Sequence, residues 1–392
     1  MNVQGVSRRD VSLTPTILPK SDVLVVALSA RTLAASARRS GLSVTALDLF
    51  ADADTAAVAD RCLALPSTRL RLPGPALRRA LALPDLCGMP LVYGAGFEDR
   101  PELLAALERD RPVIGNAAGT VARLKDPFAF AALLARLGIP HPEIATSPPG
   151  DGRGWLMKRT GASGGGHIRP LGRRSHPLPA GHYVQRRMPG RPVSLLFLTD
   201  GRRVLPMGFS RQWAAPASRQ PFRYGGAVGP LPVPRTREGI AAAMTAAVSR
   251  IAAEVGLVGL NSADFLVGPE GWCLLEINPR PGATLDLFDR PPMPGLLGLH
   301  MAACAGELPQ TLPALADCRA AMVVYARAPV LLDGRVRWPD WTADRPCTPA
   351  HIPAGAPLCT VIADAANPVE ARRLAGRRAR ELFLRHAVAE AA

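Results

Sequence analysis

Two carboxylates are spaced so that a β-hairpin would bring them together. Asp264 and Glu276 lie in neighbouring apolar segments, on either side of the turn formed by residues 268–271. Adjacent antiparallel strands place such residues side by side when both point to the same face, where their charges repel unless a cation lies between them. Asn278 lies on the same strand face as Glu276 and adds a carbonyl oxygen, so the pattern predicts a Mg²⁺ site.

An exposed hairpin with solvated charges is the alternative interpretation. Leu274, Leu275 and Ile277 surround Glu276, and these apolar neighbours favour the metal site. Arg280 is two residues beyond Asn278, so it would point the same way and could hold a phosphoryl group.

A second candidate site is a glycine-rich segment that contains Gly161, Gly164, Gly165 and Gly166. Glycine lets the backbone adopt positive φ and bring N–H groups close to a polyphosphate. Lys158, just before the segment, could reach phosphate oxygens as a point charge. The segment is not a P-loop, because no Gly-Lys-Ser/Thr closes it, and a glycine-rich hairpin or a flexible linker would look similar.

Lysine is rare in this chain: among 47 basic residues only Lys20, Lys125 and Lys158 are lysines. Arginine is a planar fork with five donors, whereas lysine is a compact point charge on a flexible stem. A position that keeps lysine in such a chain is one where arginine does not fit. Lys125 and Lys158 are therefore candidates for ligand contacts.

The order and spacing of five motifs resemble the ATP-grasp superfamily. The motifs are Lys125-Asp126, Lys158 with its glycine loop, residues 185–190, Asp264, and residues 276–280. The resemblance covers roughly residues 116 to 290, and the region before it is similar to the domain that precedes ATP-grasp domains in those enzymes.

The resemblance implies a role for each motif. Lys125 and Lys158 would contact the α- and β-phosphates of ATP, and the glycine loop with Ser163 would close over them. The backbone around Arg187 and Met188 would hydrogen-bond adenine. The metal ion, Mg²⁺ with Mn²⁺ as an alternative, would be held by Asp264, Glu276 and Asn278, and the transferred phosphoryl group by Arg280. Many members have Glu where this chain has Gln185, and no acidic residue follows it to hold the ribose hydroxyls.

The implied reaction is phosphoryl transfer to a carboxylate, followed by attack of an amine on the acyl phosphate, with Arg280 stabilising the oxyanion. Arg223 could pair with a substrate carboxylate, or be a surface arginine beside core aromatics. Thr284 ends the segment Pro281-Gly282-Ala283-Thr284, which resembles the loop lining the acceptor pocket in these ligases.

The whole chain resembles a branch of ATP-dependent carboligases linked to one-carbon cofactor synthesis, including glutamate attachment to methanofuran- or methanopterin-type cofactors. This implies a small-molecule carboxylate and an amine as partners, and a homodimer. Two other hypotheses are a biotin-carboxylase-like enzyme that activates bicarbonate, and a nucleotide-binding protein without catalysis. The chain retains Asp264, Glu276 and Asn278 together with Arg280, which argues against a nucleotide-binding protein without catalysis.

The elements expected around these motifs are typical of an α/β fold. A strand over 22–28, a helix over 31–40 and a strand over 43–47 form a βαβ opening, which predicts a parallel sheet with helices on both faces. Residues 125–137 and 239–255 read as helices, and residues 369–387 as a basic amphipathic helix packed on the protein rather than on a membrane.

The chain is expected to divide into three parts. Residues 1–115 form a Rossmann-like domain, and residues 116–300 form a two-lobed ATP-grasp domain. Its glycine-loop lobe spans about 150–185 and its metal lobe about 190–300. Residues 301–392 form a small β-rich closing region.

The composition excludes several classes of protein. The 392 residues are 48% hydrophobic and 20% charged, without an apolar run of 18, so the chain is neither disordered nor membrane-spanning. The net charge of +15 is scattered and aromatics make up only 5%, so no nucleic-acid partner is expected. A cytoplasmic location is expected, and seven widely spaced cysteines predict buried or inert thiols.

Overall fold

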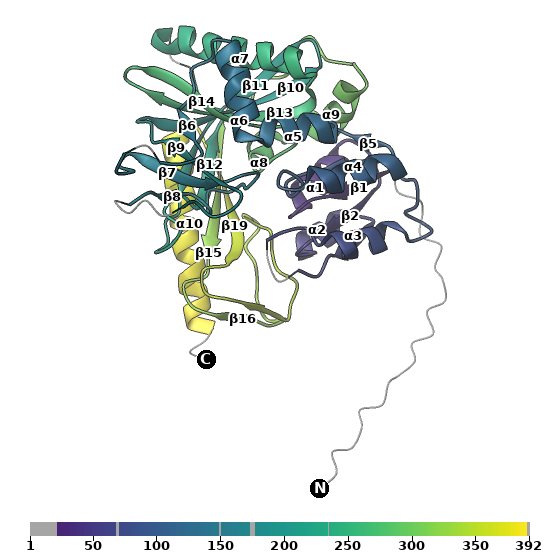
Figure 1. The fold of residues 1–392 in the computed structure, drawn as a ribbon. Coiled ribbons are helices and arrows are strands. Elements are labelled where there is room, and N and C mark those ends of the chain that lie inside the picture. The colour runs from purple at the N-terminus through teal and green to yellow at the C-terminus, as the bar shows by residue number, and fades with distance from the viewer. Residues whose placement is uncertain (1–21, 68–69, 149, 173–176, 234, 390–392) are drawn as a thin grey trace.

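The computed structural model describes residues 22–67, 70–148, 150–172, 177–233 and 235–389, with side chains up to residue 382 (Figure 1). Lys20 lies outside these residues. Throughout this part of the chain, no helix is long and apolar enough to cross a bilayer. All seven cysteines are free thiols, and Cys87 and Cys347 are exposed rather than buried.

The N-terminal part is a parallel sheet with strand order β3-β2-β1-β4-β5, which confirms the predicted α/β arrangement. Its strands are β1 (Val23–Val26), β2 (Val44–Asp48), β3 (Arg61–Ala64), β4 (Leu91–Tyr93) and β5 (Val113–Ile114), and its helices are α1 (Arg31–Arg39), α2 (Ala53–Val58), α3 (Gly74–Leu81) and α4 (Pro101–Asp110). Strand β1 is buried on both faces: Val23 and Val25 pack in one core with α1, and Leu24 and Val26 in another with α3 and α4. Parallel strands need such crossover helices.

Two short helices, α5 (Ala118–Lys125) and α6 (Pro127–Arg136), follow this sheet, so the helix predicted over 125–137 is confirmed as α6 but starts two residues later than expected. Asp126 separates the two helices. Its carboxylate accepts hydrogen bonds from the backbone N–H groups of Phe128 at 2.9 Å and Ala129 at 2.8 Å, and Pro127 occupies the first helical position. Lys125 is consequently the last residue of α5, at the corner between the two helices.

A small antiparallel sheet, in the order β6-β9-β7-β8, carries the glycine-rich segment. Its strands are β6 (Ile144–Ala145), β7 (Trp155–Arg159), β8 (Arg169–Pro170) and β9 (His182–Arg186). The glycine-rich segment connects β7 to β8, so Lys158 near the end of β7 lies at its entrance.

A large sheet, in the order β14-β13-β10-β11-β12-β15-β19-β17, forms the rest of the molecule. Its strands are β10 (Arg191–Asp200), β11 (Val204–Ala214), β12 (Tyr224–Gly229), β13 (Val258–Gly268), β14 (Gly271–Asn278), β15 (Cys318–Tyr325), β17 (Thr342–Ala343) and β19 (Pro357–Ala365), and its helices are α7 (Glu238–Val255), α8 (Leu285–Phe288), α9 (Leu296–Cys304) and α10 (Pro368–Ala389). Successive side chains of β10 point to opposite faces of the sheet, so they pack against different helices. Leu195 and Phe197 pack under α6 and α7, and Leu196 and Leu198 under α8 and α9.

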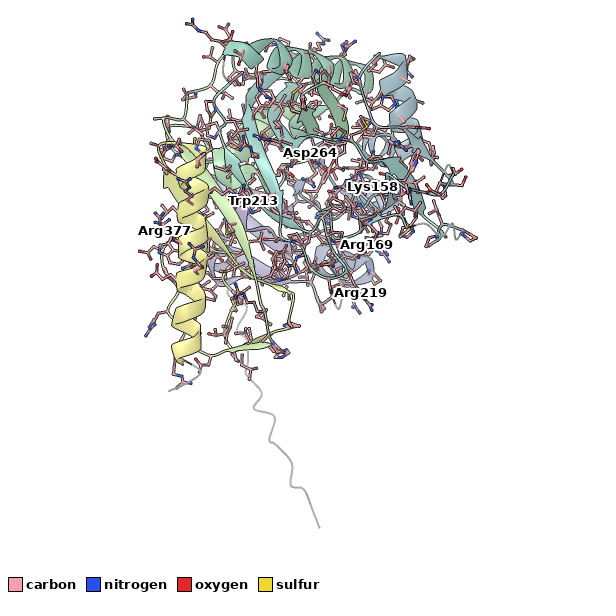
Figure 2. All side chains as sticks on the ribbon, turned by 90° about the vertical axis from the view of Figure 1, so that its left-hand side faces the viewer. Lys158, Arg169, Trp213, Arg219, Asp264 and Arg377 are labelled. Carbon is pink, nitrogen blue, oxygen red and sulfur yellow. The ribbon has the colours of Figure 1, made fainter. Side chains whose placement is uncertain are left out.

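The C-terminal strands extend this same sheet, because β15 pairs with β12 and β19 pairs with β15. In the described C-terminal residues, β16 (Val330–Leu332) and β18 (Ala350–Ile352) pair with each other apart from this sheet. Helix α10 lies along β15 and β19 (Figures 1 and 2) and packs on them through buried Leu382 and partly buried Leu374, so the basic amphipathic helix does pack on the protein as expected.

Candidate active site

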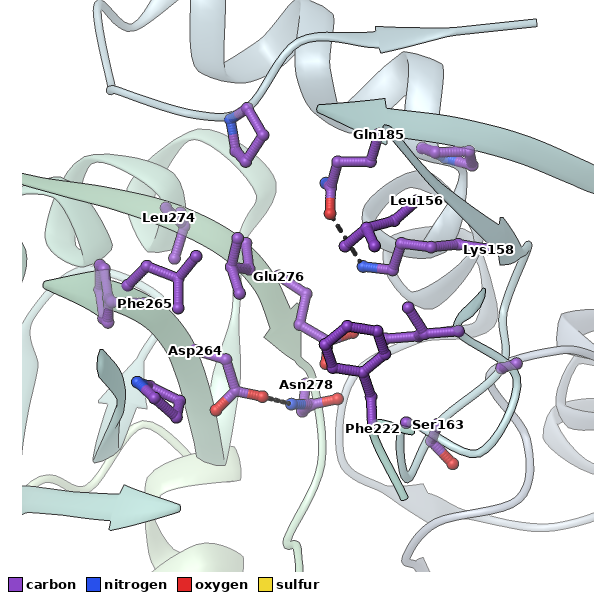
Figure 3. Close-up of a pocket in the computed structure, with 18 of the residues that line it drawn as sticks. Leu156, Lys158, Ser163, Gln185, Phe222, Asp264, Phe265, Leu274, Glu276 and Asn278 are labelled. Atoms are coloured by element: carbon purple, nitrogen blue, oxygen red, sulfur yellow. Dashed lines mark hydrogen bonds between the residues drawn. The ribbon is translucent and has the colours of Figure 1, made fainter. Parts of the chain in front are cut away.

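The hairpin of β13 and β14 brings the two carboxylates together as predicted. Asp264 and Glu276 are direct cross-strand partners, and Asn278 donates its side-chain N–H to Oδ2 of Asp264 at 3.1 Å (Figure 3). The other Asp264 oxygen, Oδ1, accepts a hydrogen bond from the side chain of Gln212 on β11 at 3.0 Å. The large sheet therefore positions three oxygen-bearing side chains within reach of one another.

Lys125 reaches this cluster from the corner between α5 and α6. Its Nζ lies 3.2 Å from Oε2 of Glu276 and 2.9 Å from Oδ1 of Asn278. Burial would raise the pKa of Glu276, but the charges of Lys125 and Lys158 outweigh it and lower the pKa to about 2. Burial and the Glu276 charge raise the pKa of Asp264 to about 6. Glu276 thus has the cation Lys125 beside it, whereas Asp264 is short of positive charge. This arrangement fits a site for a metal ion.

Lys158 faces the hairpin from the small sheet (Figure 3). It is buried, and its Nζ donates to the side-chain oxygen of Gln185 at 3.1 Å. Burial lowers the pKa of Lys158, and the negative charge of Glu276 opposes that shift. Because the direct partner is a neutral amide, the ammonium charge is available to an anion in the pocket.

The glycine loop is packed between two parts of the molecule. Gly161, Gly164 and Gly165 all have φ close to +70°, which favours glycine. A Cβ on Gly165 would come within 2.0 Å of the backbone oxygen of Phe222, whereas a Cβ on Gly164 would meet nothing within 4 Å. The backbone oxygen of Gly164 accepts a hydrogen bond from Tyr224 N–H at 2.9 Å, so the loop is attached to the large sheet.

Arg280, just beyond β14, is held by a residue of the N-terminal domain. Its Nε lies 2.8 Å from Oε1 of Glu98, and the two side chains are only 9% and 4% exposed. Burial would raise the pKa of Glu98, but the Arg280 and Lys125 charges lower it below its usual range. Glu98 also accepts a hydrogen bond from Gly96 N–H at 2.6 Å, which fixes the carboxylate.

These elements surround one cavity of about 560 Å³. The predicted site residues among its lining are Lys125, Lys158, Gly161, Ser163, Gly164, Gly165, Gln185, Arg187, Met188, Asp264, Glu276, Asn278, Arg280 and Thr284. Gly166 and Arg223 are not among its lining residues. Residues from the N-terminal part of the chain, the small antiparallel sheet and the large sheet therefore meet at this cavity.

Arg223 lies against the C-terminal strands instead. Its guanidinium stacks 3.6 Å from the ring centroid of Tyr325 and donates to the carbonyl oxygens of Ala215 and Gly355, both at 3.0 Å. At the predicted adenine segment, Arg187 N–H is bonded to the carbonyl oxygen of Gly154 at 2.8 Å. An adenine contact through this segment would therefore use Met188 or the backbone carbonyls.

Two contacts of the site were missed from the sequence. Glu98 is 182 residues from Arg280, and Gln212 is 52 residues from Asp264. No local spacing signals either pair, because each one is created by the way distant segments pack together. Asp264 and Glu276 are the only carboxylates among the cavity's described lining residues, so the ribose contact is still unassigned.

Comparisons with known proteins agree with this architecture. Residues 125–284 match the protein-family model described as an ATP-grasp domain. Across curated proteins, no sequence matches this chain.

Solved structures resemble nearly the whole chain. The biotin carboxylase of Campylobacter jejuni has 13% identity and a TM-score of 0.67 over 90% of this chain and 89% of its own. The biotin carboxylase domain of Hydrogenobacter thermophilus 2-oxoglutarate carboxylase, solved as a dimer with MgADP and bicarbonate, has 13% identity and a TM-score of 0.67 over 89% and 87%. N5-carboxyaminoimidazole ribonucleotide synthetase of Thermus thermophilus has 18% identity and a TM-score of 0.65 over 91% and 98%.

The predicted arrangement of an N-terminal parallel sheet followed by ATP-grasp lobes is thereby confirmed: the chain has the α/β ATP-grasp fold, like biotin carboxylase.

Proposed function

We propose that the protein is an ATP-dependent ligase that joins a carboxylate to an amine through an acyl phosphate. The observation that carries this proposal is one cavity that is lined by two lysines, a glycine-rich loop, an acidic hairpin and Arg280 together. Cations, backbone donors and hard oxygen ligands converge there, as positioning and charge neutralisation of a transferring phosphoryl group require.

Each lining group has a role in this chemistry. Lys125 and Lys158 hold phosphate groups of ATP, and the glycine loop covers them. Asp264, Glu276 and Asn278 hold Mg²⁺, with Mn²⁺ as an alternative, and the bound ion neutralises charge on the phosphates. A substrate carboxylate oxygen attacks the γ-phosphorus and ADP leaves.

The second step forms the new bond. The amine nitrogen attacks the acyl carbon, and phosphate leaves with the former carboxylate oxygen. Arg280 stabilises the negative oxygen formed in this step, and Glu98 fixes the orientation of its guanidinium. This sequence of steps needs no side-chain nucleophile.

The substrates proposed are a one-carbon carrier precursor of methanofuran or methanopterin type and glutamate as the amine. The motif resemblance to that branch of carboligases supports them, and the net charge of +15 suits an acidic substrate. Thr284, which is buried beside the cavity, contributes to the acceptor pocket. We propose a homodimer in the cytoplasm.

A second candidate is activation of bicarbonate in place of an organic acid. It is favoured by the structural resemblance to carboxylases, one of them solved with bicarbonate. Both candidates use the same phosphoryl-transfer site and differ in the acceptor.

ADP release by the purified protein distinguishes the two. ATP and Mg²⁺ are supplied with a panel of carboxylates paired with glutamate and other amines, with and without bicarbonate. Stimulation by one acid and amine pair supports the ligase, whereas stimulation by bicarbonate alone supports the second candidate. The Glu276→Gln variant is the control for contaminating ATPase activity.

A further inference from the structure

A second cavity lies on the opposite face of the large sheet from the candidate active site. Gln212 and Arg211 are neighbours on β11, and successive side chains of a strand point to opposite faces. Gln212 bonds to Asp264 in the first cavity, while Arg211 lines the second, whose volume is about 650 Å³. The floor of the second cavity is β11, β12 and β15, and α10 forms its wall.

Arginine dominates the lining of this cavity. Arg211 comes from the sheet, and α10 adds Arg372, Arg373, Arg377 and Arg380. The four helix positions recur at helical spacing and form one face of α10. In the described part of the chain no acidic residue lines the cavity, and none of the five arginines is in an ion pair. Arg372, Arg373, Arg377 and Arg380 are exposed and Arg211 is partly buried, so five positive charges border one open concave space that has no acidic residue among its described lining.

Two features indicate that this concavity is built into the fold. Nε of Arg211 is buried without a hydrogen-bond partner among the described residues, and leaving such a donor unsatisfied is costly. Gly376 interrupts the interior of α10 at the cavity wall, where glycine is less favourable for the helix than alanine. A Cβ at this position would have only Arg380 nearby, at 3.9 Å, so glycine leaves the space open.

One side chain of the second cavity contacts a side chain that lines the first. The guanidinium of Arg372 lies 4.7 Å from the ring centroid of Trp213, and Trp213 lines the first cavity as well. Figure 2 shows Trp213 between α10 and Asp264. The arginine cavity is thus one side chain away from the residues that line the candidate active site.

We propose that the arginine cavity binds a small polyanion that carries several phosphate or carboxylate groups. Arginine pairs with both groups through two parallel N–H bonds, and a concave space of this volume suits a small molecule. A nucleic acid would instead be expected to need an extended basic track with aromatic platforms.

The test is isothermal titration calorimetry at 0.15 M salt, where non-specific attraction between exposed charges is screened. Tripolyphosphate and citrate serve as phosphate and carboxylate probes, with Mg²⁺ omitted. The titrations are repeated in Lys158→Gln, which weakens binding at the first cavity. The proposal expects a site that persists in Lys158→Gln for at least one probe, and the stronger probe identifies the preferred anion.

Two variants of the second cavity are compared. Arg373→Gln/Arg377→Gln removes charge, and Gly376→Met fills the space while keeping every arginine. Both should weaken the persistent site at least tenfold, with ATP binding at the first cavity retained. The matched control is Arg202→Gln/Arg237→Gln, which removes two exposed arginines elsewhere, and circular dichroism monitors folding.

Three results would overturn the proposal. The first is that neither probe binds in Lys158→Gln, and the second is wild-type affinity in the Arg373/Arg377 double variant. The third is binding of a duplex DNA that depends on these arginines while both small probes fail, which would assign the surface to a nucleic acid. None of these results depends on the ligase activity, so the two proposals fail separately.

Discussion

Glu98 and Arg280 form a buried ion pair that joins the N-terminal part of the chain to the end of the β13–β14 hairpin, with 2.8 Å between Oε1 and Nε. One partner follows β4 and the other follows β14. Removing one charge of a buried pair leaves the other uncompensated, which is strongly destabilising, whereas an exposed pair contributes little. The pair therefore couples the orientation of a proposed catalytic guanidinium to the packing of two domains.

Replacing Glu98 by Gln tests this coupling. The amide keeps the volume but removes the charge that holds Arg280. We expect kcat to fall, but by less than the roughly 100- to 1000-fold that removal of a whole oriented donor costs, because the guanidinium itself remains. The KM for ATP should change much less. Steady-state kinetics measures the effect on catalysis, and the melting temperature measures the effect on stability. A variant that melts earlier but retains kcat would show that the pair is only structural.

Replacing Glu276 by Gln tests the metal assignment. The change removes one of the two carboxylates and the partner of Lys125, so we expect loss of Mg²⁺-dependent turnover with the fold retained. The measurement is ADP release across a Mg²⁺ titration. The exposed Glu270→Gln in the turn of the same hairpin is the control. Turnover equal to wild type in Glu276→Gln would contradict the assignment.

Replacing Lys158 by Arg tests why lysine is retained there. The side chain is buried with its ammonium 3.1 Å from Gln185, so the larger guanidinium should displace its neighbours. We expect weaker ATP binding, measured by calorimetry. Wild-type nucleotide affinity would show that lysine has no special role at this position.

Two glycine substitutions form a matched pair. Gly164 and Gly165 have φ of 71° and 69°, so alanine costs about 1 to 2 kcal/mol in either position. Only at Gly165 would the new Cβ collide with backbone, at Phe222. We therefore expect Gly165→Ala to impair ATP binding and turnover much more than Gly164→Ala. Equal effects in nucleotide titrations would mean that contact with Phe222 is unimportant for the loop.

His300 on α9 predicts a pH dependence of stability. Its Nδ1 accepts Leu260 N–H at 2.9 Å, which leaves Nε2 to donate to the carbonyl oxygen of Ile114 at 3.1 Å. The ring is therefore neutral, and burial lowers its pKa to about 4 from 6.5. As the pH falls, the unfolded chain takes up a proton at this histidine before the folded chain does. The free energy of unfolding should therefore decrease by about 3 kcal/mol as the pH is lowered from 6.5 to 4.

Urea unfolding of the wild type and His300→Gln across this pH range measures the effect. Glutamine does not titrate, so the stability difference between the two proteins should shrink as the pH falls. A stability difference that stays constant between pH 7 and 4 would show that protonation of His300 does not change the free energy of unfolding.

The sequence predicted the parts of the site that depend on local spacing. The two-residue turn alone would place Asp264 opposite Leu275, and a β-bulge that leaves Leu275 unpaired shifts the register by one residue, so that Asp264 and Glu276 become cross-strand partners. The break at Asp126 was missed although its signal was present, since an N-cap aspartate before Pro127 starts a new helix.

Relationships between distant segments were not predictable in this way. The Glu98 to Arg280 pair and the Gln212 to Asp264 bond join elements whose meeting depends on the tertiary packing. The same holds for β15, which continues the large sheet by pairing with β12 across about 90 intervening residues rather than forming a sheet of its own. The hydrogen bonds between strands are made by the backbone and do not depend on residue type. The sequence of one strand therefore does not predict which other strand it pairs with.

The most direct test of the central claim follows an oxygen atom. The acid that stimulates ADP release is prepared with ¹⁸O in its carboxylate and turned over with ATP, Mg²⁺ and its amine. A ligase that forms an acyl phosphate transfers one ¹⁸O from each acid molecule to the released inorganic phosphate, detected by mass spectrometry. Phosphate that carries no label from the acid, while the amide product accumulates, would contradict the acyl-phosphate route.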